Sequence, residues 1–244
     1  PLFRRDARLG ALIDQIGPVE RELQELLAQM KERVQSGPCF SFSVSYQNHG
    51  PYEWAAPANT EYVTPEGSGL DQESCNIWNH YLSGVGETIA AMNKLTQDLD
   101  SLDEPVVLVL FGDHKPWGGN GNSAYIEMGA TFDLSTLDGF YDYYATPYVI
   151  WANDAAAETL DWDAAAEALD LPETISASFL GAAVLELTGR GEETPWFAFL
   201  NALRRVSPVV QKQTCVLADG STVSPLDAGA VPAALEDSLR QWRC

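Results

Sequence analysis

The chain has 244 residues, of which 45% are hydrophobic and 10% aromatic, enough to build a buried core and unlike a disordered tail. Its formal net charge of −21, from 14 basic and 35 acidic side chains, repels phosphate backbones and argues against a nucleic-acid partner. The longest apolar run, residues 106–111, is far too short to span a bilayer. No basic segment followed by an apolar stretch opens the sequence, so we expect no signal peptide in it; since residue 1 is Pro, we expect a piece of a longer protein.

The first half of the chain alternates helical and strand patterns. Leucines at helical spacing predict an amphipathic helix over residues 19–35, ended by Gly37 and Pro38. Apolar residues alternate with serines over 40–46, which predicts a strand that runs into a polar loop at 47–51. Residues 53–74 are rich in Pro, Gly, Ser and Thr and predict a long loop or lid, and 76–99 predict a helix.

The second half begins with a continuous β-branched and leucine run at 105–111, typical of a strand buried on both faces of a parallel sheet. Strands separated by helices indicate an α/β fold with a mostly parallel sheet. After this run the sequence predicts a loop over 117–139, a strand at 147–151, helices at 176–187, 194–205 and 231–242, and a hairpin at 215–221 with Asp219-Gly220 at its turn.

Polar clusters follow two of the predicted strands. His49 follows the first, and Asp113 and His114 follow the second after Gly112. Because ligands of such sheets bind beyond the carboxyl ends of the strands, we expect these three side chains to converge there. Carboxylate and imidazole suit a divalent cation. On spacing alone, His49 is equally well explained as a loop histidine and Asp113-His114 as a turn packed on Trp117; the remaining histidine, in the predicted helix at 76–99, is interpreted as structural.

Charge is uneven along the sequence. Residues 39–200 hold 25 acidic and only 3 basic side chains. Such a segment suits a protein whose site holds a divalent cation, because the metal supplies the missing positive charge. A solvated surface that keeps the protein soluble explains the same pattern.

Three blocks of sequence together resemble a known family. They are Phe42-Ser43-Val44-Ser45-Tyr46-Gln47-Asn48-His49-Gly50-Pro51-Tyr52, then Tyr81-Leu82-Ser83-Gly84-Val85 followed by Gly112-Asp113-His114, and finally Thr146-Pro147-Tyr148-Val149-Ile150-Trp151-Ala152-Asn153. The chain from about Gly37 to its end is similar to the extracellular domain of the lipoteichoic acid synthase family, in the sulfatase branch of the alkaline phosphatase superfamily.

The resemblance implies a fold and a division of the chain. The fold is an alkaline phosphatase/sulfatase-like α/β three-layer sandwich with a mostly parallel sheet, whose N-terminal part is missing here. Residues 1–36 would be a surface helix segment, 37–205 the C-terminal part of the catalytic domain, and 206–244 a hairpin and helix extension.

The resemblance also implies site residues and an activity. Asp113 and His114 would be ligands of Mn²⁺ or Mg²⁺, and His49 would contact the phosphoryl group or glycerol of the substrate. The activity would be transfer of glycerophosphate from phosphatidylglycerol, an anionic glycerophospholipid, to a cell-envelope glycan or glycolipid. The family's nucleophilic threonine and first acidic metal ligand are expected upstream, so we expect this chain alone to be inactive. The domain is expected on the extracellular face of the cell membrane, anchored by an N-terminal transmembrane region absent here.

Two alternatives stay open. Another member of the superfamily, a sulfatase, phosphodiesterase or phosphoethanolamine transferase, would use the same cation frame. A non-catalytic remnant that binds cell-wall polymer is the alternative of another class.

Four cysteines, at 39, 75, 215 and 244, form no C-x-x-C pair, so a zinc ribbon is not supported. A family-like extracellular location would permit a Cys215–Cys244 disulfide, with Cys39 and Cys75 unpaired.

Overall fold

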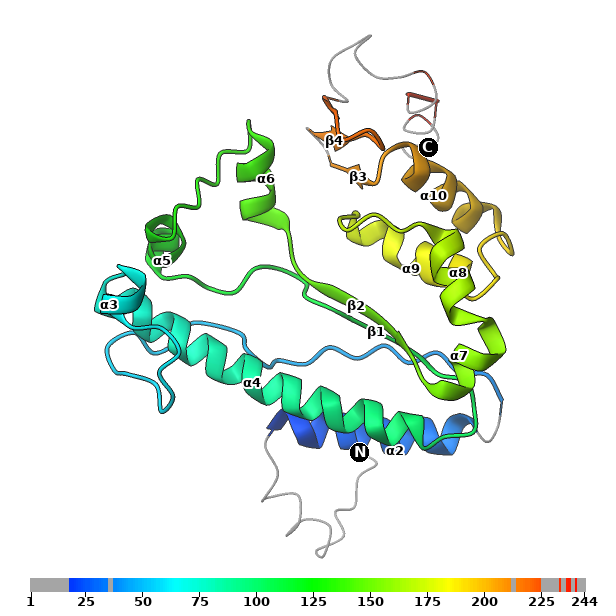
Figure 1. Ribbon diagram of the computed structural model, residues 1–244, viewed down its shortest axis with the longest axis horizontal. Coiled ribbons are helices and arrows are strands. Elements are labelled where there is room, and N and C mark those ends of the chain that lie inside the picture. The colour runs from blue at the N-terminus through cyan, green and yellow to red at the C-terminus, as the bar shows by residue number, and fades with distance from the viewer. Residues whose placement is uncertain are drawn as a thin grey trace, which may run out of the picture. The chain divides into compact units, whose positions relative to one another are not determined.

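The structure, a computed structural model, describes residues 18–34, 37–211 and 214–224, together with positions 233, 236, 237 and 240. The predicted helix at 231–242 and Cys244 therefore lie largely or wholly outside the described residues. Figure 1 shows the ribbon. Its elements are α2 (Pro18–Val34), α3 (Pro65–Ser68), α4 (Gln72–Asp100), β1 (Val107–Phe111), the 3-10 turn η1 (Asn120–Asn122), α5 (Ser123–Glu127), α6 (Leu137–Tyr144), β2 (Tyr148–Ala152), α7 (Asp154–Leu160), α8 (Trp162–Leu169), α9 (Ala177–Leu187), α10 (Pro195–Val206), β3 (Val209–Val210), β4 (Cys215–Val216) and β5 (Thr222–Val223).

The chain divides into two compact units. Unit 1 consists of residues 1–104 and 109–149, and unit 2 of residues 105–108 and 150–244. Strands β1 and β2 pair with each other and contribute residues to both units. Among the described residues no helix is long and apolar enough to cross a membrane.

Unit 1 is built around the long helix α4. Asp71 caps it by accepting a hydrogen bond from the Ser74 N–H at 2.7 Å, and α2 packs along its side (Figure 1). The predicted helices at 19–35 and 76–99 are thus confirmed, although α4 begins earlier, within the predicted loop. The core of this unit is Leu70, Cys75, Ile77, Trp78 and Ala124, with Tyr52, Val63, Tyr81, Trp117 and Tyr125 packed against it.

The predicted strand at 40–46 is wrong as a sheet strand. This segment has no helix or strand assignment, and its apolar side chains are exposed, with Phe40 at 86% and Phe42 at 66%. Alternation encodes the shape of a strand, but a strand also needs a neighbour for its backbone hydrogen bonds, and no strand of the described residues pairs with this one.

Strands β1 and β2 form at the predicted places, but the prediction of parallel strands is wrong for this pair. Gly112 N–H donates to the Pro147 carbonyl at 3.1 Å and Asn153 N–H donates to the Val106 carbonyl at 3.0 Å. Residue numbers rise along one strand as they fall along the other, which is an antiparallel pairing. The segment between them, predicted to be a loop, contains α5 and the start of α6, and it returns the chain to the end of β1 that it left.

The prediction that β1 is buried on both faces is wrong as well. Val106 is buried, but Leu110 and Phe111 are 40% and 43% exposed. Both faces of a parallel sheet are covered by its crossover helices, whereas the described residues form an antiparallel pair of strands here, which needs no such crossover.

Unit 2 is mostly helical, with a small antiparallel sheet. Helices α9 and α10 match the predicted ranges and pack on each other, and their core is Phe179, Ala182, Leu200, Leu203 and Cys215. The predicted hairpin is confirmed: β4 pairs with β5 across a turn at 218–220, and β3 adds a third strand. Cys39, Cys75 and Cys215 are free thiols in the structure.

Unit 2 contains an ion-pair centre at Glu186 and a buried hydrogen-bond centre at Asn153. Arg204, whose side chain is 1% exposed, donates from Nη2 to Glu186 at 2.7 Å, and Arg205 donates to the same carboxylate. Asn153 is fully buried, and its Oδ1 accepts hydrogen bonds from the N–H groups of Val106 at 2.8 Å and Ala156 at 2.9 Å.

The Asn153→Ala substitution should destabilise unit 2 by about 2–4 kcal/mol, because it leaves two buried N–H groups without an acceptor. Thr194→Ala is the matched control: it removes a single exposed helix cap, which accepts from the Phe197 N–H, and should cost about 1 kcal/mol or less. Urea unfolding followed by tryptophan fluorescence measures both. Equal losses for the two variants would contradict the role given to Asn153.

Candidate active site

His49 lies on a tight turn that follows the extended segment 38–46. Its N–H donates to the Tyr46 carbonyl at 3.3 Å, and Asn48 takes a left-handed backbone conformation with φ of 63°, which Asn tolerates better than most residues. The Tyr46 ring stacks on the His49 imidazole at 4.6 Å between centroids. The turn therefore fixes both the backbone and one face of the His49 ring.

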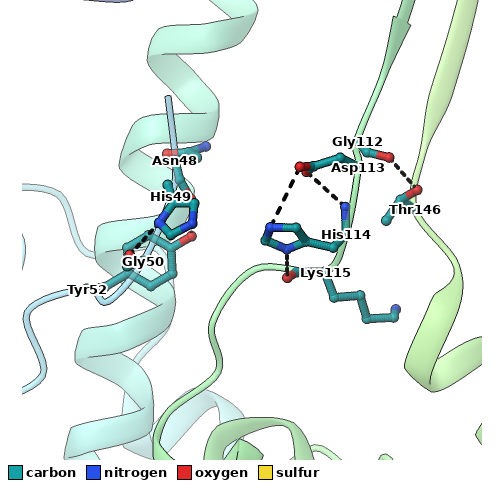
Figure 2. Close-up of polar contacts among 9 residues, drawn as sticks. All are labelled: Asn48, His49, Gly50, Tyr52, Gly112, Asp113, His114, Lys115 and Thr146. Carbon is teal, nitrogen blue, oxygen red and sulfur yellow. Dashed lines mark hydrogen bonds and ion pairs between the residues drawn. The ribbon is translucent and has the colours of Figure 1, made fainter. Parts of the chain in front are cut away.

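Asp113 and His114 follow Gly112, the first residue after β1. Gly112 is held to the β2 side from two directions, since its N–H donates to Pro147 and its carbonyl accepts from the Thr146 hydroxyl at 2.8 Å. Asp113 Oδ1 then accepts the His114 N–H at 2.9 Å, while Oδ2 lies 3.7 Å from His114 Nε2 (Figure 2). The Asp113 carboxylate and Nε2 of the His114 imidazole therefore lie side by side.

Both imidazoles have their Nδ1 occupied by a backbone carbonyl. His49 Nδ1 lies 2.6 Å from the Gly50 carbonyl oxygen, and His114 Nδ1 lies 2.8 Å from that of Lys115. A carbonyl oxygen only accepts, so each Nδ1 carries the proton, and in the neutral ring Nε2 keeps its lone pair. This arrangement leaves Nε2 of each histidine available to a cation or a substrate.

The structure brings the two histidines together. Their ring centroids are 5.9 Å apart and the ring planes stand at 87° to each other. Figure 2 shows the two side chains pointing toward one another from separate segments. Asp113 and His114 are 77% and 60% exposed, so the site is open to solvent. The expected convergence of His49 with Asp113-His114 is therefore found, although it does not depend on a parallel sheet.

An aromatic cluster, defined as Tyr52, Trp78, Tyr81, Trp117 and Tyr125, joins the two segments. Tyr52 packs on Tyr81 and Trp117, and Trp78 meets Tyr125 edge to face at 4.8 Å. Each of two hydroxyls bonds one segment: Tyr52 donates to the Asn48 carbonyl, and Tyr125 donates to the Pro116 carbonyl at 3.1 Å. Both segments are thus fixed on α4 by the same cluster.

Burial in this cluster raises tyrosine pKa values. It raises the pKa of Tyr52 to about 12, with the charge of Tyr81 as a smaller cause, and it raises the pKa of Tyr125 to about 12, with Tyr81 and Tyr52 as smaller causes. Burial also raises the pKa of Tyr81. Folding therefore favours the neutral phenols.

The donor set fits a hard or borderline divalent cation but is small. A carboxylate oxygen and an imidazole nitrogen are ligands that Mn²⁺ and Mg²⁺ accept. Within the part of the chain that the structure describes, no group of three or more His, Cys, Asp or Glu side chains could hold a metal ion. Asp113 and His114 could therefore supply only part of a coordination shell.

The remaining predicted residue and the predicted lid are structural. His80 Nε2 lies 3.1 Å from the Ala56 carbonyl oxygen, which agrees with its structural interpretation. The loop after Tyr52 is bound to α4 rather than free: buried Asn79 accepts from the N–H groups of Tyr62 and Val63 and donates to the Val63 carbonyl. Asn79 was not predicted, because a single asparagine within a predicted helix carries no sequence signal of its own.

Comparisons with known proteins identify the family. A sequence model of the family described as Sulfatase matches residues 18–189, which is most of the chain. A protein of Rhizobium meliloti (strain 1021), named "Putative cyclic beta-1,2-glucan modification protein", is 25% identical over 97% of this chain. The chain spans 35% of that relative's length. No solved structure matches.

Unit 1 should lose stability as the pH rises from about 10 to about 12. The pKa values of Tyr52 and Tyr125 in the folded state lie above their ordinary value of 10.0, so their stabilising contribution is complete below pH 10 and is lost through pH 12. Thermal unfolding across this range should show a shallower decline in the Tyr52→Phe, Tyr125→Phe double variant. Tyr143→Phe, an exposed tyrosine outside the cluster, should leave the decline unchanged. A decline equally steep in all three proteins would contradict the pKa assignment.

The match over residues 18–189 covers both site segments and the helix beneath them, and the chain belongs to the sulfatase family.

Proposed function

We propose that this chain forms the cation- and substrate-binding part of a metal-dependent phosphoglycerol transferase. The enzyme would move glycerophosphate from phosphatidylglycerol to a cell-envelope glycan or glycolipid. The observation that carries the proposal is the pairing of His49 with His114 at 5.9 Å beside Asp113, each ring with Nδ1 held by a carbonyl and Nε2 available.

Asp113 and His114 would hold Mn²⁺ or Mg²⁺ through a carboxylate oxygen and Nε2. When bound, the cation would stabilise negative charge on the nonbridging phosphoryl oxygens and lower the pKa of the nucleophile. Asp113 Oδ1 already accepts the His114 N–H, which orients the carboxylate so that Oδ2 faces the imidazole. The Asp113 carboxylate and the His114 imidazole are thus oriented relative to each other before a cation binds.

His49 would act on the substrate rather than on the cation. With Nδ1 donating to Gly50, the neutral ring accepts a hydrogen bond at Nε2 from a glycerol hydroxyl, and the protonated ring donates one from Nε2 to a phosphoryl or leaving oxygen. The stacked Tyr46 covers one face of the ring and restricts its rotation. One side chain can therefore steady either part of a glycerophosphate.

The remaining catalytic groups belong, in this proposal, to sequence outside this chain. The nucleophilic threonine, the further metal ligands and a membrane anchor would lie in the rest of a longer protein, as the relative is almost three times as long as the matched region. The domain would then work at the extracellular face of the cell membrane. Among acceptors, an envelope glucan is favoured by the name of the relative.

A sulfatase-type hydrolase or phosphoethanolamine transferase is the second candidate, favoured by the family match itself. The same ligands would serve a sulfate or phosphate ester, because both present nonbridging oxygens to a cation. The substrate separates the two candidates.

The test uses the full-length protein that contains this chain, with Mn²⁺, headgroup-labelled phosphatidylglycerol and a cyclic β-glucan acceptor. The proposal predicts label in the glucan, with turnover abolished in Asp113→Ala and His114→Ala because the cation is lost. His49→Ala should retain the metal and lose turnover through substrate binding. Glu53→Gln serves as control, because this exposed carboxylate accepts the Ala55 N–H of its own loop.

Parallel assays with an aryl sulfate and with headgroup-labelled phosphatidylethanolamine test the alternatives. Hydrolysis of the sulfate ester, or transfer of phosphoethanolamine without glycerophosphate transfer, would replace the proposal by the second candidate. Binding of the glucan with no turnover of any of the three donors would instead indicate a non-catalytic binding module.

A further inference from the structure

The turn that carries His49 is in very close contact with Trp117, the third residue after His114. A methyl group added at the Gly50 Cα would lie 2.5 Å from the Trp117 Cβ and 3.7 Å from its Cα. In proteins, Cβ atoms essentially never approach nonbonded atoms of other residues within 3.0 Å. Because the Trp117 Cβ is bonded directly to the backbone, it cannot swing aside as the end of a long side chain can. The absence of a side chain at position 50 is therefore what permits this approach.

The same turn meets α4 at a second glycine. The Asn48 amide covers Gly84 so closely that a methyl group there would overlap the amide oxygen. Asn48 is also the left-handed residue of the turn, and its carbonyl accepts the hydroxyl of Tyr52. The turn is thus seated between α4 on one side and the segment after His114 on the other.

These two contacts lie next to the hydrogen bond that orients His49. Its Nδ1 is bonded to the carbonyl of Gly50, the residue that touches Trp117. His114 is oriented in the same way by the carbonyl of Lys115, two residues before Trp117. The two carbonyls that accept from the histidine Nδ1 groups, those of Gly50 and Lys115, are therefore connected through a few residues across the contact between Gly50 and the Trp117 Cβ.

We infer that Gly50 and Gly84 are positioning residues that set the spacing between His49 and His114. Neither glycine contacts a substrate in this inference; each acts by letting the turn lie against a neighbour. The catalytic meaning of the spacing rests on the proposed function, whereas the spacing itself is measurable without it.

The experiment measures the nuclear Overhauser effect between the ring protons of His49 and His114 in the 244-residue chain. Gly50→Ala should abolish it and should move the His49 ring resonances toward those of an unstacked histidine as the imidazole leaves the Tyr46 ring. Gly86→Ala is the matched control on α4, because a methyl group there would meet the Tyr62 hydroxyl at an ordinary 3.6 Å. An effect of normal size in Gly50→Ala would overturn the assignment of Gly50.

A second pair of variants tests Gly84 and decides the matter if Gly50→Ala does not fold. Gly84→Ala should weaken the effect severalfold, although alanine favours helix more than glycine does. Adding Asn48→Gly removes the overlapping amide, keeps a residue that accepts positive φ, and should restore the effect. An undiminished effect in Gly84→Ala, or no recovery in the double variant, would overturn the inference.

The outcome is separable from that of the activity assay. Loss and recovery of the ring contact, with no turnover of phosphatidylglycerol by the full-length protein, would leave the positioning role intact and remove only the proposed reaction. An unchanged ring contact in the variants together with normal turnover would remove the positioning role and leave the proposed reaction intact.

Discussion

Close packing of two irregular backbone segments is the constraint on which the site depends. The His49 turn and the segment from Asp113 to Trp117 belong to no helix or strand, so the hydrogen bonds of regular structure cannot fix the distance between them. The aromatic cluster takes over that task. Its rings fill the space between the segments and α4, and two half-buried hydroxyls need acceptors, which they find in one carbonyl of each segment. Satisfying the polar ends of the core therefore also orders the site.

Charge and exposure limit how tightly Asp113 and His114 could hold a cation. The segment 39–200 carries 25 acidic and 3 basic side chains, and the carboxylate and imidazole of Asp113-His114 are largely exposed. Solvent screens such a pair, so two ligands alone would hold a cation only weakly. In the proposed enzyme, further ligands from the rest of the protein would enclose the cation and supply the affinity, and the cation would in turn bring an anionic phospholipid to an acidic surface.

The sequence predicts the four longest helices and the convergence of His49 with Asp113 and His114, and the physical reasons for its failures are specific. Helices α2, α9 and α10 follow from local periodicity, and β1 and β2 from apolar runs, because these patterns depend on neighbours in the chain. The antiparallel pairing of β1 with β2 depends on where residues 112–147 return, which no local pattern records. The segment 40–46 has the pattern of a strand but no partner. The convergence of His49, Asp113 and His114 was predictable because polar residues follow apolar runs. The tautomers of the two histidines were not, since the acceptors are backbone carbonyls, which every residue type carries.

Paramagnetic broadening by Mn²⁺ tests most directly the claim that one cation site lies beside His49. The chain holds three histidines, so the ring resonances of His49, His80 and His114 can be followed separately during a Mn²⁺ titration. We expect His114 and His49 to broaden more strongly than His80, whose Nε2 faces the Ala56 carbonyl, and we expect Asp113→Ala to abolish this difference. Equal broadening of His80 and His49, or broadening of His49 that survives Asp113→Ala, would contradict the claim.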